Sequence, residues 1–175
     1  GTRTQFKKDL ITELCAVLSF SAIQNNDKIG VIFFSNQIEK FIPPKKGKTH
    51  ILRIIREMIE FEPQHKGTDI SVALKYLTNA IKKRSICFLI SDFMDNGFED
   101  ALKLANRKHD LVALQITDPG EDQLPNVGLI RLQDPETGAS RLIDTSDADI
   151  REKFRRDKML FKKELKEMLA VAGVD

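Results

Sequence analysis

The chain has 175 residues, of which 41% are hydrophobic and 31% are charged, a balance typical of a folded domain rather than a disordered segment. Its 28 Lys and Arg residues nearly equal its 26 Asp and Glu residues, and this balance argues against a nucleic-acid partner. No stretch approaches the roughly 20 apolar residues of a membrane span, so we expect no membrane contact from this segment.

Helical and strand-like apolar patterns alternate along most of the chain. The patterns predict, in order, a helix over 7–25, a buried strand over 29–34, an edge strand over 38–42 ended by Pro43 and Pro44, a helix over 50–61, a helix starting after Asp69, a strand over 85–90, a helix over 98–108 and a strand over 111–116. This alternation indicates an α/β fold with a doubly wound, mostly parallel sheet and helices on both faces.

After this region the alternation of predicted helices and buried strands ends. Residues 128–132 and 140–143 flank the turn-rich stretch 134–138 and predict an antiparallel hairpin. A long amphipathic helix follows, capped by Thr145 or Ser146 and stopped by Gly173. We therefore expect an α/β domain over 1–145 and a C-terminal helix over 146–175 that packs on it.

Two cysteines, Cys15 and Cys87, lie among apolar neighbours. Such positions are typical of buried free thiols, and nothing in the sequence requires a disulfide. A reducing cytoplasm is the compartment that this pattern favours.

Hydroxyl and carboxylate side chains follow the predicted parallel strands. Ligands of open parallel sheets bind beyond the carboxyl ends of the strands, and hard cations such as Mg²⁺ prefer oxygen ligands. We therefore expect a site on this edge built around Thr68 and Asp92. Further residues on the same edge are Ser35, Ser91, Asp69, Asp95, Thr117 and Asp118.

Several of these residues also have purely structural interpretations. Thr68 or Asp69 can serve as the N-cap of the following helix, and Asp92 can form a turn after its strand. Asp118 precedes Pro119, a combination typical of a turn. The shared edge, more than any single residue, indicates a site.

The chain resembles the von Willebrand factor A-type fold, whose metal-ion-dependent adhesion site uses three loops. Thr68 matches the Thr of the second loop, and Asp92 matches the Asp of the third. The chain resembles more closely a family of uncharacterised bacterial proteins with such a domain, often encoded beside MoxR-type AAA+ ATPases. The motifs that carry this resemblance are Asp27-Lys28-Ile29-Gly30-Val31, Pro43-Pro44-Lys45, Gly67-Thr68-Asp69, Ser91-Asp92-Phe93 and Asp118-Pro119.

The first loop of that adhesion site, D-x-S-x-S, does not occur in this sequence. The resemblance places it just before the first helix, on a central strand between the strands at Ile29 and Ser85. We therefore expect a fragment without its first strand, with two strand edges facing a gap. Exposed edges recruit strands, so the gap stays open or takes another segment, for example from a second copy.

The resemblance implies a non-catalytic protein-interaction domain whose Mg²⁺ is completed by an acidic side chain of the partner. The implied partner is a MoxR-type ATPase or its client. The alternative is a Mg²⁺-dependent phosphohydrolase using Asp92, Asp95 and Asp118. The sequence offers no evident nucleophile for that chemistry, and its three histidines lack ligand spacing. Gly47-Lys48-Thr49 does not make a phosphate-binding loop, because Ile42 occupies the position where that motif needs Gly.

Overall fold

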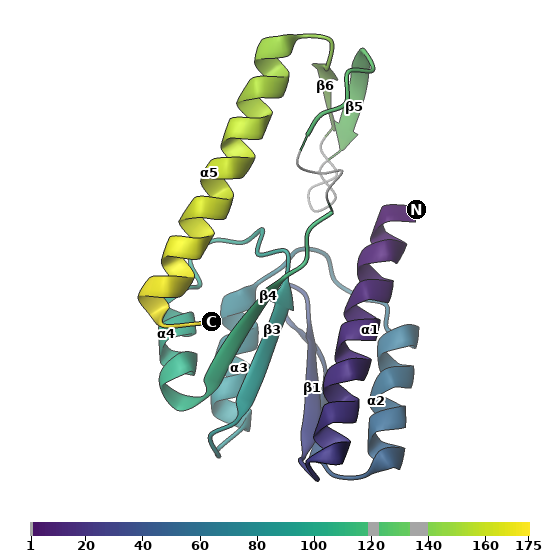
Figure 1. Ribbon diagram of the computed structural model, residues 1–175, viewed down its shortest axis with the longest axis vertical. Helices are drawn as coiled ribbons and strands as arrows, with labels where there is room; N and C mark the ends of the chain where they lie inside the picture. Colours follow the sequence, from purple (N-terminus) through teal and green to yellow (C-terminus); the bar gives the residue numbers. More distant parts are fainter. Residues whose placement is uncertain (1, 119–122, 134–139) are drawn as a thin grey trace. The chain divides into compact units, whose positions relative to one another are not determined.

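The computed structural model describes residues 2–118, 123–133 and 140–175, and the chain divides into two compact units (Figure 1). The first unit, Gly1–Ile116, contains α1 (Thr2–Gln24), β1 (Ile29–Phe34), β2 (Ile38–Lys45), α2 (Lys48–Glu60), α3 (Ile70–Ala80), β3 (Ile86–Ser91), α4 (Glu99–Lys108) and β4 (Asp110–Gln115). The second unit, Thr117–Asp175, contains β5 (Leu129–Gln133), β6 (Ser140–Asp144) and α5 (Ala148–Ala172). The hairpin thus groups with α5.

The described strands form three two-stranded sheets. β1 pairs with β2 and β5 with β6 in antiparallel fashion, whereas β3 and β4 are parallel. The α/β class is therefore confirmed, but these strands do not make one doubly wound sheet. The physical reason is that β1 and β3 each have a single partner strand in the described part of the chain, and they do not pair with each other.

Helices cover both faces of the β1–β2 sheet. On one face Ile42, Ile54 and Met58 form a buried cluster, against which Ile11 and Cys15 of α1 pack. Burial of each large apolar side chain contributes about 1.5–3 kcal/mol, so this cluster fixes α1 and α2 on that face. On the other face Phe41 of β2 meets Tyr76 of α3 edge-on, with ring centroids 5.4 Å apart.

The prediction that Pro43 and Pro44 end the second strand was wrong, because β2 continues to Lys45. β2 lies at a sheet edge with β1 as its only described partner, so a missing backbone N–H is tolerated there. Close packing of the two strands makes Gly30 necessary. A Cβ at that position would lie 2.6 Å from the Ile42 carbonyl oxygen and 2.8 Å from the Pro44 nitrogen.

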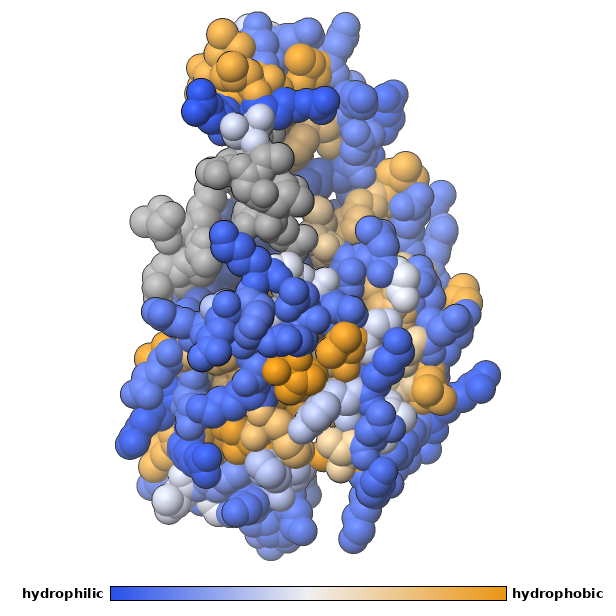
Figure 2. Space-filling model, turned by 180° about the vertical axis from the view of Figure 1, so that it is seen from behind, coloured by the Kyte–Doolittle hydropathy of each residue, from blue (hydrophilic) through white to orange (hydrophobic). Residues whose placement is uncertain are grey.

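β3 is less covered than a central parallel strand. Leu89 is buried, but Ile86 is 66% exposed and Phe88 is 42% exposed. Figure 2, which views the molecule from the side opposite to Figure 1, shows hydrophobic residues (orange) exposed among hydrophilic ones (blue). Ile86 and Phe88 are two residues apart and therefore share one face of the sheet, so this face of β3 is only partly covered.

In the second unit the buried Thr145, just after β6, is hydrogen-bonded to the segment just before β5. Its hydroxyl donates to the Gly128 carbonyl (2.6 Å) and accepts from the Val127 N–H (3.1 Å). The predicted cap of the last helix was wrong, because Asp147 caps α5 through the Asp149 N–H. Gly173 ends α5 in the left-handed conformation, as predicted. The predicted turn over 134–138 lies outside the described residues.

Both cysteines are free and half-buried, and burial raises the pKa of each thiol to about 11. Each thiol is therefore protonated near neutral pH, which makes it a poor nucleophile. None of the helices in the described ranges is long and apolar enough to cross a membrane.

Candidate functional site at the carboxyl ends of the strands

Three loops of the first unit meet where β1 and β3 end (Figure 1). The Asp69 N–H, just before α3, donates to the Ser35 carbonyl after β1 (2.9 Å). The Ile70 N–H donates to Asp95 Oδ2 in the loop after β3 (2.8 Å). These bonds bring the loop of Thr68 between the ends of the two strands, as the sequence pattern predicted.

The start of α3 separates the roles of two neighbouring residues. Asp69 is the N-cap, and its Oδ1 accepts from the Val72 N–H (2.9 Å). Thr68 is therefore not the cap. The residue is half-buried, and its hydroxyl has no hydrogen-bond partner in the part of the chain that the structure describes. Gly67 precedes it with φ +84°, a conformation that favours glycine. The structural interpretation of Thr68 as a cap is excluded.

Asp92 follows β3 and keeps much of its carboxylate accessible. Its side chain is 43% exposed, with Oδ1 accepting from the Met94 N–H (3.2 Å) and Oδ2 lying 4.0 Å from Lys7 Nζ of α1. The Met94 bond is a local turn bond, and the Lys7 ammonium lies near the second oxygen at a distance longer than a hydrogen bond. Asp92 can therefore offer an oxygen to a cation at this edge.

The loop after Asp92 is held in an unusual conformation. Phe93 has φ 59° although it is not glycine, and it is completely buried. Its ring lies 6.2 Å from that of Phe98, and its N–H donates to the Ser91 hydroxyl oxygen (3.0 Å). Left-handed backbone at a bulky residue costs free energy, and here packing keeps it in place. Ser91 thus serves the turn, with its hydroxyl accepting from the backbone.

Asp95, predicted at the site rim, is a structural link. Its Oδ2 accepts from the Ile70 N–H (2.8 Å) and its Oδ1 from the Asn96 N–H (2.7 Å). Both oxygens are therefore engaged with backbone donors, and the residue ties the Asp92 loop to the start of α3.

Replacing Asp95 by alanine is expected to destabilise the fold by about 1 kcal/mol, because the Ile70 N–H at the helix start loses its acceptor. Asp95→Asn, which keeps an acceptor oxygen, should lose less. Urea unfolding of the two variants measures the difference. An alanine variant as stable as the parent chain would show that Asp95 does not hold the loop.

The remaining predicted residues do not enlarge the donor set. Asp118 belongs to the second unit. No group of three His, Cys, Asp or Glu side chains suited to a metal ion occurs within the described ranges. Among the predicted site residues of the first unit, the Thr68 hydroxyl and the partly exposed Asp92 carboxylate can still offer a lone pair to a ligand.

Sequence patterns missed a second set of residues beneath the Thr68 loop. Glu39 on β2 has a side chain that is only 4% exposed, and it accepts from the Ser35 hydroxyl (2.7 Å) and from the His65 N–H (3.0 Å). The one available signal was a carboxylate within a predicted strand, between Ile38 and Lys40. Its loop partner at His65 is 26 residues away and has no signal in the pattern.

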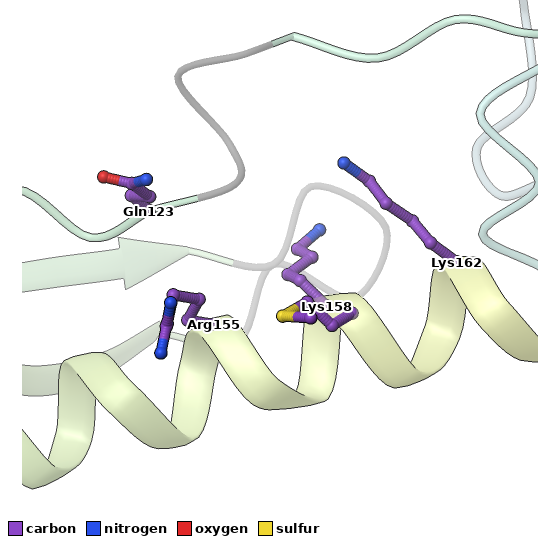
Figure 3. A pocket seen from close by; sticks show the side chains of 5 residues that line it. Gln123, Arg155, Lys158 and Lys162 are labelled. Atoms are coloured by element: carbon purple, nitrogen blue, oxygen red, sulfur yellow. The ribbon is translucent and has the colours of Figure 1, made fainter.

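A basic pocket of about 220 Å³ lies within the second unit (Figure 3). Arg155, Lys158 and Lys162 extend from α5, with Gln123 on the segment before β5 (Figure 3). Arg155 pairs with Glu152 (2.8 Å), and Lys158 Nζ lies 5.8 Å from the centroid of the Phe154 ring. The pocket is a charged surface of α5 and contains none of the predicted site residues.

The fold and this edge define a class of mixed α/β domain with a hydroxyl and a carboxylate at the carboxyl ends of its strands. The profile of the family described as "Protein of unknown function DUF58" matches residues 1–164. The chain belongs to this family.

Curated relatives are mycobacterial. Uncharacterized protein Rv1480 of Mycobacterium tuberculosis and Uncharacterized protein Mb1516 of Mycobacterium bovis are each 28% identical to the chain over 160 residues, covering 89% of it and 50% of the relative. Uncharacterized protein MAV169 of Mycobacterium avium is 27% identical over 118 residues, covering 66% of the chain and 69% of the relative. The chain spans about half the length of the first two relatives.

Two solved structures share the fold. An aerotolerance-related membrane protein from Bacteroides fragilis aligns with a TM-score of 0.58 at 16% identity, covering 85% of this chain and 76% of its own. BatB, a conserved hypothetical protein from Bacteroides thetaiotaomicron, aligns with a TM-score of 0.53 at 18% identity, covering 98% of this chain and 88% of its own. At these identities the likeness concerns the fold alone.

Proposed function

We propose that the chain is a non-catalytic protein-interaction domain of the von Willebrand factor A type. In this proposal Thr68 and Asp92 supply two elements of a metal-ion-dependent adhesion site. The observation that carries it is the Thr68 hydroxyl, which has no bonding partner among the residues that the structure describes, although Asp69 beside it caps α3. A hydroxyl without a protein partner, at the same edge of the sheet as Asp92, is suited to bind a ligand.

Mg²⁺ is the cation that this donor chemistry favours, because it binds hard oxygen ligands in an octahedron and keeps several waters. In the proposed complex, a D-x-S-x-S loop of the kind that the resemblance implies and an acidic side chain of a partner complete the coordination. The resemblance to proteins encoded beside MoxR-type ATPases makes such an ATPase, or its client, the proposed partner in the cytoplasm.

The phosphohydrolase alternative needs Asp92, Asp95 and Asp118 around one metal ion. Both Asp95 oxygens already accept from backbone N–H groups of Ile70 and Asn96. Turning Asp95 towards a metal ion would cost the Ile70 bond at the start of α3. The geometry therefore favours the binding domain over the hydrolase.

Titration of the 175-residue chain with Mg²⁺ tests the proposal. Two donors of an octahedral site give weak binding, so we expect saturable NMR shifts of Thr68 and Asp92 only at millimolar Mg²⁺, about 10⁻³ M. Na⁺ at equal ionic strength controls for screening. Shifts that saturate elsewhere in the chain, with these two residues unchanged, would contradict the proposal.

A further inference from the structure

The loop that carries Thr68 joins α2 to α3 and is anchored at both ends to the β1–β2 hairpin. At its start the Phe61 ring lies 4.5 Å from the Phe33 ring of β1. At its end the Asp69 N–H donates to the Ser35 carbonyl (2.9 Å). Between these ends the loop has no helix or strand, so other contacts must set its path near Thr68.

Glu39 of β2 provides the contact in the middle of the loop. Its Oε1 accepts from the Ser35 hydroxyl (2.7 Å) and from the His65 N–H (3.0 Å), and lies 3.2 Å from His65 Nδ1. Gln37 Nε2 lies 2.8 Å from His65 Nδ1 and 3.0 Å from His65 Nε2, so the hairpin turn contacts the same imidazole ring. A single carboxylate oxygen thus holds the hairpin turn and the loop together.

The environment of Glu39 favours its charged form. The donated hydrogen bond from Ser35 is the largest cause that holds the pKa of Glu39 below its usual value, and the bonds from His65 act in the same direction. A side chain only 4% exposed that remains a carboxylate must keep its donors, because an ion without partners is costly to bury. The arrangement therefore resists movement of His65, three residues before Thr68.

We propose that Glu39 is a positioning residue for the Thr68 site, acting through His65. It touches neither Thr68 nor a ligand in this arrangement; it holds the loop so that the Thr68 hydroxyl stays at the strand edge. The role in ligand binding rests on the proposed function, whereas the clamp itself does not.

Amide exchange of His65 measures the clamp without any metal. Glu39→Ala removes the acceptor, so the protection factor of the His65 amide should fall about tenfold, with the amides of Ile42 and Ile54 unchanged. Glu39→Gln keeps an acceptor oxygen and should restore most of the protection. Glu62→Ala, on an exposed side chain of the same loop, is the matched control and should change nothing. Unchanged His65 protection in Glu39→Ala overturns the proposal.

A double-mutant cycle with Mg²⁺ as the probe connects the clamp to the site. We expect Glu39→Ala to weaken Mg²⁺ binding about threefold to tenfold, and to add nothing in a chain that already carries Thr68→Ala. Additive effects would mean that Glu39 acts elsewhere and would overturn its positioning role. If Thr68→Ala alone leaves Mg²⁺ binding unchanged, the proposed function fails, and the His65 amide still decides whether the clamp exists.

Discussion

Replacing Asp92 by alanine is expected to abolish the saturable Mg²⁺ response of the chain, a loss of at least about tenfold in affinity. Asp92 has a side chain that is 43% exposed, and its Oδ2 accepts from no backbone donor in the described residues, whereas both oxygens of Asp95 do. The fold should survive, because the removed contacts are one turn bond to Met94 and an ion pair at 4.0 Å with Lys7. A change in stability within about 1 kcal/mol is expected for such exposed contacts.

The measurement is a Mg²⁺ titration of parent and variant followed by NMR, with thermal unfolding to confirm the fold. Asp27→Ala is the matched control, since Asp27 is exposed in the turn before β1, at the other end of that strand. The control should bind Mg²⁺ as the parent does. Binding that survives in Asp92→Ala would place the metal elsewhere and remove Asp92 from the site.

The second large difference is expected in the hydrogen exchange of the β3 backbone amides. The Ser85 carbonyl accepts from the Asp110 N–H and the Ser91 carbonyl from the Ile116 N–H, each at 2.9 Å. Backbone groups of alternate residues in a parallel strand face the same neighbour. The backbone groups of Cys87 and Leu89, which alternate with Ser85 and Ser91, therefore face β4. Those of Ile86, Phe88 and Ile90 face the edge without a described partner strand.

Residue-resolved hydrogen exchange of the 175-residue chain should reveal this alternation. We expect the amides of Phe88 and Ile90 to exchange at least about tenfold faster than those of Cys87 and Leu89, because only the latter pair bonds to β4. The comparison is internal to one strand, so it is insensitive to overall stability. Equal protection of all four amides would mean that the edge is occupied.

Protein concentration then identifies an occupant from a second copy. If protection of Phe88 and Ile90 rises with concentration while light scattering shows a dimer, a strand from another copy fills the edge. A monomer with fast exchange at both amides dismisses recruitment between copies.

Local patterns were sufficient for most elements. β1 has the predicted bounds 29–34, α3 begins directly after Asp69, and Gly173 ends α5. These features depend on side-chain periodicity and on single residues at helix ends, both of which are written in short stretches of sequence. The β2 boundary was missed because tolerance of Pro43 and Pro44 depends on the strand lying at an edge, which is a property of the sheet.

The sequence by itself placed Thr68 and Asp92 on one edge, because alternation of helix and strand brings the ends of parallel strands to the same side. Only the tertiary structure decided which of the neighbouring oxygens stay available. Asp69 Oδ1 and both Asp95 oxygens accept from backbone N–H groups, and Glu39 enters from another strand, while the Thr68 hydroxyl is left without a partner in the described chain. Hydrogen bonds form within about 3 Å, and such proximity between loops distant in sequence is set by packing.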